Sequence, residues 1–293
     1  MKVLTIVALA LVTATADADE VRRVVDASPN GLVTIVNTAG SITVRGWSRD
    51  SVEVVAELGK NVEELIVERD GDEVLVKVKL PKRQRNDRGS ASDLAIQVPQ
   101  NSSLKIAGVS ADIDVNDVLG AQQLQSVSGD VDVHAFAADI DAESVSGDVT
   151  VAGNGGNLRT RANTVSGNVD VSDLGGELTA GSVTGDVTVV NGSFSRTSME
   201  TTNGDMVFKA GLRDDGRLDV ETVNGDVDID FSRKPSARFD IETFNGDIKN
   251  CFGPKAERTS QYAPGRELVF TEGGGSGRVV IRTLNGDLRI CHD

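Results

Sequence analysis

VSGDVDV at residues 127–133 is followed by VSGDVTV at residues 145–151, and this repetition decides the fold. From about residue 109 the same pattern occurs nine times. One position in the pattern is a glycine in all copies but the first. These positions, called the glycine column, are Ala111, Gly129, Gly147, Gly167, Gly185, Gly204, Gly225, Gly246 and Gly286. Successive members are 18, 18, 20, 18, 19, 21, 21 and 40 residues apart. A period near 20 residues is typical of a solenoid, in which each repeat is one supersecondary unit stacked on the next.

The residues after each glycine alternate between apolar and polar side chains. In the first full copy Val131 and Val133 flank Asp132, and the other copies follow this pattern. A period of two predicts a strand whose apolar positions face inward. A second short strand precedes the glycine in several repeats, as at residues 178–180 and 218–220. The sequence therefore predicts an all-β protein, a single-stranded parallel β-helix of about 18–21 residues per turn, right-handed by the crossover rule.

The glycine fits a corner where the chain turns between strands and a Cβ atom would be costly. The residue before it changes from hydroxyl to amide midway along the chain. The row is Ser110, Ser128, Ser146, Ser166, Thr184, Asn203, Asn224, Asn245 and Asn285. Asparagine side chains stacked at the rung spacing can hydrogen-bond along the axis of the solenoid.

The domain organisation follows from where the repeat is regular. Residues 19–103 are related but irregular, and we interpret them as an N-terminal β cap with the first rungs, including a hairpin turn at Asp70-Gly71. Residues 104–293 hold the repeats. The wide spacing between Gly246 and Gly286 predicts a loop or hairpin inserted at about 252–278.

Residues 1–18 read MKVLTIVALALVTATADA, with one lysine, an apolar stretch and small residues at the end. This is the pattern of a signal peptide cleaved after about Ala18. The apolar stretch is about half of the roughly 20 residues that a transmembrane helix needs. We therefore expect export, to the periplasm or to the outside of the cell, with no transmembrane segment.

The chain of 293 residues carries a formal net charge of −15 and only 3% aromatic residues. This acidic balance argues against a nucleic-acid partner, because binding of the phosphate backbone relies on clustered Lys and Arg. A core poor in aromatics and rich in valine suits β-strands.

Several motifs resemble the putative-adhesin β-helix family of secreted bacterial proteins. They are the L-x-I-x-V-P stretch at 94–99, the repeated [ST]-x-[ST/N]-G-D-[VI]-x-[VI] corners and the closing G-x-V-x-I-x-T-x-N-G-D-L-x-I at 277–290. The resemblance covers most of the chain after the leader. It implies a β-helix, an envelope or extracellular location and an adhesin-like role, and it transfers no catalytic residue.

An acid row follows the glycines. It consists of Asp112, Asp130, Asp148, Asp186, Asp205, Asp226, Asp247 and Asp287, and Asn168 occupies the remaining rung. Stacking brings its members about 4.8 Å apart, and a bound Ca²⁺ would relieve their repulsion. The alternative is that each aspartate accepts a backbone N–H of its own turn and points into water. The sequence predicts no other cofactor.

Paired carboxylates also raise the possibility of a polysaccharide-acting enzyme. Retaining glycosidases place two carboxyl groups about 5–5.5 Å apart, but any aspartate row in a β-helix has a similar spacing. The chain lacks the aromatic platforms that sugar subsites use, so we predict no catalytic residue and a protein that is not an enzyme.

Cys251 and Cys291 each follow a corner glycine by five residues. If the segment between them is an excursion, the two rungs are neighbours, and their Cα atoms lie near the roughly 5 Å of a disulfide. An exported protein with two cysteines in register is expected to join them.

A basic run stands out against the acidic background and is a candidate patch for an anionic envelope polymer or lipid headgroup: Lys77, Lys79, Lys82, Arg83, Arg85 and Arg88. The alternative is a solvated loop beside an edge strand.

Together these features predict a non-enzymatic adhesin-like or envelope-associated scaffold with an unidentified macromolecular partner. The alternatives are the polysaccharide-acting enzyme and a self-assembling structural element.

Overall fold

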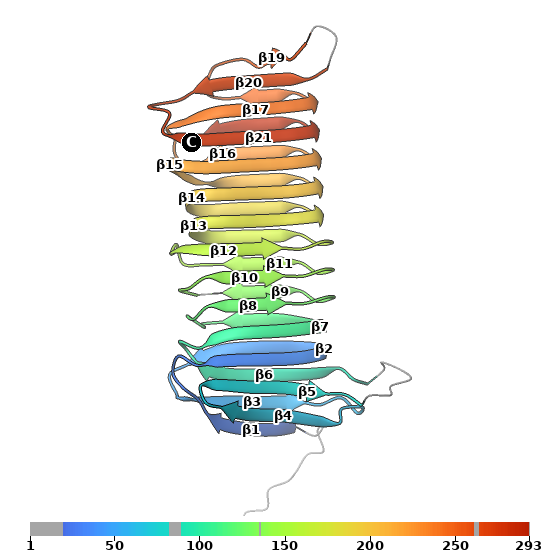
Figure 1. The fold of residues 1–293 in the computed structure, drawn as a ribbon. Coiled ribbons are helices and arrows are strands. Elements are labelled where there is room, and N and C mark those ends of the chain that lie inside the picture. Colours follow the sequence, from blue (N-terminus) through green and yellow to red (C-terminus); the bar gives the residue numbers. More distant parts are fainter. Residues whose placement is uncertain (1–19, 82–88, 135, 261–263, 293) are drawn as a thin grey trace, which may run out of the picture.

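The alternating residues after each corner form the strands of a long column (Figure 1). A computed structural model describes residues 20–81, 89–134, 136–260 and 264–292. The leader, residues 1–18, lies outside this range. Within it the chain is all-β, without a helix. In chain order the strands before the repeats are β1 (Glu20–Asp26), β2 (Leu32–Trp47), β3 (Ser51–Glu57), β4 (Glu64–Asp70), β5 (Glu73–Lys79) and β6 (Ser92–Pro99).

The repeats form a β-solenoid in which equivalent strands of successive rungs pair in parallel. Its regular part consists of β7 (Ser103–Asn116), β8 (Gln122–Gln125), β9 (Val131–His134), β10 (Ile140–Glu143), β11 (Val149–Ala152), β12 (Asn157–Asn163), β13 (Val169–Thr184), β14 (Val187–Asn203), β15 (Met206–Asn224) and β16 (Val227–Phe231). One ladder joins the strands before the corners, and the other joins the strands after them. The register places Val131 beside Val149 and Val149 beside Val169, as the repeat predicts.

The inward positions form a continuous apolar core. The two valines of β9 are fully buried, and so are their equivalents in the following rungs, which include Phe208 in β15 and Ile229 in β16. In the C-terminal half phenylalanines stack along the axis, with ring centroids 5.9 Å apart for Phe208 and Phe231 and 4.4 Å for Phe239 and Phe270. Each rung alone buries too little surface to be stable, so the rungs support one another.

The C-terminal strands depart from a simple winding of one rung after another. They are β17 (Ala237–Asn245), β18 (Ile248–Asn250), β19 (Glu257–Arg258), β20 (Arg266–Thr271), β21 (Gly277–Asn285) and β22 (Leu288–His292). β21 pairs with both β15 and β17, and β22 pairs with both β16 and β18. The last rung of the sequence is therefore inserted between the two preceding rungs, as the position of β21 in Figure 1 shows. Winding in chain order would have made it the terminal rung, but it is paired on both sides.

Antiparallel strands cover both ends of the column. At one end β20 pairs with β17 and β19 pairs with β20. At the other end β3 pairs with β6, β1 pairs with β3, and β4 forms a hairpin with β5 through a turn at Gly71 and Asp72, one residue later than the sequence predicted. β2 carries the first rung and pairs in parallel with β5 and β6 on one side and β7 on the other. Covered ends leave few unpaired backbone groups to recruit another chain.

Candidate functional site: one edge of the solenoid

The corners of all the rungs line up along one edge of the column, and four rows of side chains define it. The first row lies three residues before each glycine and is buried. Except for that of Thr222, its hydroxyls donate to the glycine-column carbonyl of the neighbouring rung, as from Ser144 Oγ to Gly129 O at 2.9 Å and from Thr243 Oγ1 to Gly286 O at 3.0 Å. The sequence showed a Ser or Thr in this place, but its role emerges only from the stacking.

The amide row directly before the glycines binds along the axis, as predicted. Asn224 donates from Nδ2 to Oδ1 of Asn203 at 2.8 Å, and Asn285 and Asn245 continue the chain with the same distance. This chain of bonds runs through the inserted rung, because Asn285 lies between Asn224 and Asn245. The amides therefore hold the inserted rung in register with both neighbours.

The acid row joins neighbouring rungs. The backbone N–H of Asp130 donates to Oδ1 of Asp112 at 3.1 Å, and the same bond recurs along the row, with Asn168 Oδ1 accepting from Asp186. From Asp112 to Asp287 the members of the row thus accept the N–H of the adjacent rung, and not one of their own turn as in the alternative that the sequence left open. In the described part of the chain no three His, Cys, Asp or Glu side chains are grouped to hold a metal ion. The calcium site stays a prediction.

We expect Asp205→Ala to lower the free energy of unfolding by about 1 kcal/mol, because the N–H of Asp226, which donates to Asp205 Oδ1 at 2.8 Å, loses its acceptor. Asp205→Asn keeps an acceptor, as Asn168 does naturally, and should unfold like the wild type. Urea unfolding with excess calcium and with a chelator checks both statements. Calcium-dependent stability in the wild type, lost in Asp205→Asn, would instead establish the cation site.

The carboxyl of Asp170, which lies beside the acid row, gives a pH-dependent prediction. Burial raises the pKa of Asp170, and the negative charges of Asp148 and Asp186 raise it further, although a hydrogen bond with Thr188 opposes them. A carboxyl with a raised folded-state pKa costs stability as an anion, and this cost disappears as the pH falls through that pKa. Asp170→Asn should therefore raise the melting temperature at pH 7, by an amount that shrinks toward pH 3. A gain that is constant over this range would contradict the assignment.

The fourth row is apolar and exposed, and sequence reasoning assigned it no role. It lies two residues before each glycine, and its apolar side chains are 40–50% exposed. In stacking order this apolar row is Val109, Val127, Val145, Val165, Val183, Thr202, Val223, Leu284 and Phe244. In the sequence this row could have been found as the apolar residue that begins the recurring corner motif, as in VSGD. Aligned apolar side chains that remain in contact with water mark an interaction surface.

Beside the C-terminal part of the apolar row lies a groove of about 580 Å³. One wall is the apolar row from Val183 to Phe244. The other is formed by Glu200, Glu221, Arg282 and Glu242, which project from the strands before the corners. Arg282 Nη1 lies 3.2 Å from Oε1 of Glu221. The groove therefore has one apolar wall and one predominantly acidic wall.

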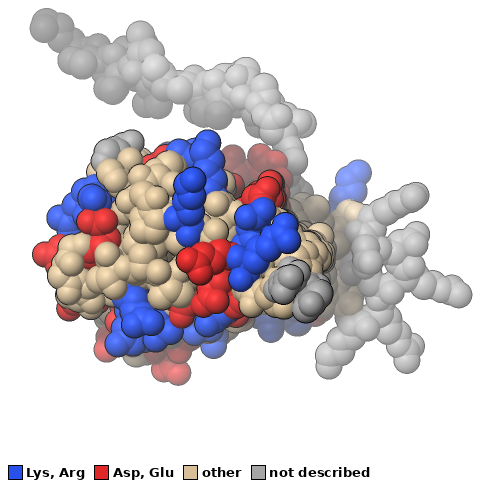
Figure 2. All heavy atoms as spheres, turned by 90° about the horizontal axis from the view of Figure 1, so that it is seen from above, with Lys and Arg blue, Asp and Glu red and all other residues tan. Residues whose placement is uncertain are grey.

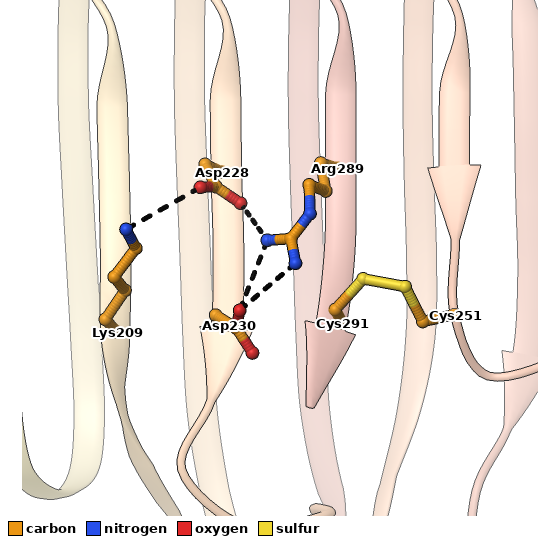
Figure 3. Close-up of polar contacts among 6 residues, drawn as sticks. All are labelled: Lys209, Asp228, Asp230, Cys251, Arg289 and Cys291. Carbon is orange, nitrogen blue, oxygen red and sulfur yellow. Dashed lines mark hydrogen bonds and ion pairs between the residues drawn. A yellow bond between two sulfur atoms is a disulfide. The ribbon is translucent and has the colours of Figure 1, made fainter. Parts of the chain in front are cut away.

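The cysteines lie on the opposite side of the corners, at the end of β22 and just after β18. Cys251 and Cys291 form a disulfide, as predicted, with Cα atoms 4.8 Å apart. On the other side of the inserted strand, Arg289 contacts Asp228 at 2.5 Å and Asp230 at 3.2 Å (Figure 3). These hydrogen bonds raise the pKa of Arg289. The inserted rung is thus tied to one neighbour by a covalent bond and to the other by ion pairs.

The basic run is described only in part. Lys77 and Lys79 lie on β5, and Nζ of Lys79 is 2.9 Å from Glu63 and 3.7 Å from Glu64. Lys82, Arg83, Arg85 and Arg88 lie outside the described residues. Lys79 therefore already has acidic partners, and the anionic-partner patch stays a prediction.

A model of one protein family matches residues 12–175 and 177–291, nearly the whole sequence. The chain belongs to the Toastrack DUF4097 family. This agrees with the resemblance to a family of adhesin-like proteins whose function is uncharacterised. No curated protein matches the sequence.

Solved structures similar to this Toastrack chain include a "putative adhesin" from Bacteroides fragilis, with 11% identity and a TM-score of 0.47. A "putative adhesin" and a "putative lipid binding protein" from Parabacteroides distasonis share 11% and 12% identity, with TM-scores of 0.49 and 0.44. Each alignment covers 94% of this chain and 98% of the other. At this identity the likeness concerns the fold alone.

In this Toastrack chain the positions that recur from repeat to repeat thus have different structural roles. Side chains of the hydroxyl, amide and acid rows join the rungs by hydrogen bonds, whereas the apolar side chains of the fourth row remain 40–50% exposed. The apolar row and its groove are therefore the candidate contact surface of this edge.

Proposed function

We propose that this protein is an exported, non-enzymatic, adhesin-like scaffold that contacts its macromolecular partner along the apolar row. The observation that carries the proposal is the row itself, which is exposed on rung after rung while the core remains closed. A rigid column with one regular edge suits a protein that presents a surface rather than a cleft for chemistry.

Two features support export. The pattern of residues 1–18 is that of a cleavable signal peptide, and disulfides persist mainly in oxidising compartments outside the cytoplasm. In the described part of the chain no helix is long and apolar enough to cross a membrane. We also propose that the rungs from β7 to β16, where stacking follows chain order, wind as a right-handed single-stranded β-helix.

The enzyme alternative has little support from the edge. The carboxylates that could act as a pair each accept a backbone N–H, as Asp205 and Asp226 do. Their spacing follows from the rung spacing rather than from a substrate.

End-to-end self-assembly is also poorly supported. At the C-terminal end the outermost strand is β19, which consists of two charged residues. Viewed along the axis from this end, acidic and basic side chains are interspersed with uncharged residues (Figure 2). Short charged edge strands oppose the addition of further strands.

The test combines location and binding. Expressed with its leader in a bacterium, the protein should be recovered outside the cytoplasm with Asp19 as its first residue. The mature protein should sediment with bacterial cell-envelope fragments, and a variant with all eight apolar members of the row replaced by Thr should not. Thr202 shows that the row accepts threonine. Cytoplasmic protein with an intact leader, or equal sedimentation of the variant, would overturn the proposal, as would release of sugars from a polysaccharide panel.

A further inference from the structure

The groove beside the apolar row has a chemical character that narrows the class of partner. It extends over five stacked corners, from the rung of Val183 to the rung of Phe244. At a rung spacing of about 4.8 Å these corners span roughly 19 Å. Val183, Val223, Leu284 and Phe244 are 40–47% exposed along this span and, with Thr202 on the rung between Val183 and Val223, they form a ridge of mainly apolar side chains at the rung spacing.

Both sides of this ridge are acidic. On the groove side lie Glu200, Glu221 and Glu242 with Arg282. On the far side, beyond the amide row and the glycine column, lies the exposed acid row, where only Asp247 has a described basic partner, with Arg266 Nε at 2.6 Å. The members of the acid row on these rungs are Asp186, Asp205, Asp226, Asp287 and Asp247. Eight carboxylates and two guanidinium groups therefore flank the ridge, so charge complementarity favours a cationic partner.

The geometry also restricts the shape of this partner. An extended strand repeats its side chains on one face about every 6.8 Å, whereas one turn of an α-helix advances about 5.4 Å, closer to the rung spacing. An apolar stripe on a helix of about 13 residues would match the ridge over its whole length. Basic residues beside that stripe would then face the carboxylates on both sides.

We propose that this part of the edge binds a Lys/Arg-rich amphipathic helix, with its apolar stripe on the ridge and its basic residues against the two acidic rows. The inference rests on the proposed function and names the chemistry of the partner. A second copy of this chain would place acidic rows against acidic rows, and an anionic lipid surface would be repelled for the same reason.

The experiment uses a fluorescent 14-residue peptide of Leu and Lys with leucines at helical i, i+3, i+4 spacing, titrated with the mature protein. We expect saturable binding that weakens as salt is raised. A peptide of the same composition in scrambled order, and a Leu/Glu peptide with the helical pattern, should bind at least tenfold more weakly. Circular dichroism should show that the peptide gains helix on binding.

Matched variants locate the site. Val223→Thr with Leu284→Thr should weaken binding at least tenfold. Val127→Thr with Val145→Thr alters the same row on rungs that the groove does not reach, where the wall positions hold Gln125 and Glu143, and should change it less than twofold. Melting temperatures of both variants establish that they are folded.

Equal binding of the scrambled peptide, or equal losses in both pairs of variants, would overturn the inference. The first result would show attraction by net charge alone, and the second would show that the whole apolar row, and not the groove, binds the peptide. Loss of the inference leaves the proposed function intact if the protein is still exported and still sediments with envelopes through its apolar row. If instead the peptide binds specifically but the protein does not sediment with envelopes, the proposed function fails and the peptide-binding site stands.

Discussion

Gly147→Ala is expected to destabilise the solenoid by about 3 kcal/mol, the upper part of the usual range for overpacking. A Cβ atom at this position would lie 2.2 Å from the carbonyl oxygen of Gly129 and 2.6 Å from its carbon. These are backbone atoms of the next rung, held by ladder hydrogen bonds on both sides, so they cannot rotate away as a side chain would. The two rungs would have to separate, which weakens the hydrogen bonds of the acid and hydroxyl rows.

Urea unfolding measures the loss, and hydrogen exchange locates it. We expect faster exchange of backbone amides in β9 and β11, the paired strands that follow the corners of Gly129 and Gly147. Gly274→Ala is the matched control, because its Cβ would meet only Ser236 Oγ at 3.6 Å. That variant should stay within about 0.5 kcal/mol of the wild type. Similar stability for Gly147→Ala and the wild type would show that the corners can open without cost.

Removing the disulfide is expected to have an effect of similar size, concentrated at one end. The bond closes a loop with a sequence separation of 40 residues, for which the chain-entropy model gives roughly 4 kcal/mol. Cys251→Ser with Cys291→Ser should therefore unfold at lower urea concentration. Because β22 also pairs with β16 and carries Arg289, the inserted rung should remain native under mild conditions but exchange its amides faster than β9 or β11.

The wild type in the presence of a reductant provides the control, since it loses the same bond without a change of sequence. The two samples should agree in midpoint and in exchange pattern. Uniformly faster exchange over the whole column would contradict the local assignment, and an unchanged midpoint would show that the ion pairs and ladder bonds suffice to hold the rung.

The candidate site was only partly accessible to sequence reasoning. The acid row and the cysteine pair could be read from their fixed distance to the corner glycine. The residues of the apolar row recur in the sequence, but their exposure could not be predicted from it, because exposure at a corner depends on how far the chain turns there. The groove could not be inferred at all, since its walls come from two rows that belong to different strands.

The sequence by itself determined the local conformation and the alignment of each rung. Alternation after the glycine sets which side chains face inward, and the corner motif sets where each strand ends, so Val131, Val149 and Val169 had to stack. Only the tertiary structure decided which rung lies beside which. Repeats with the same pattern and register accept one another equally well as neighbours, and the five residues 232–236 that connect β16 to β17 span the place of a whole rung. The closing strands β21 and β22 could therefore enter that place, because stacking energy depends on all the rungs together and not on their order along the chain.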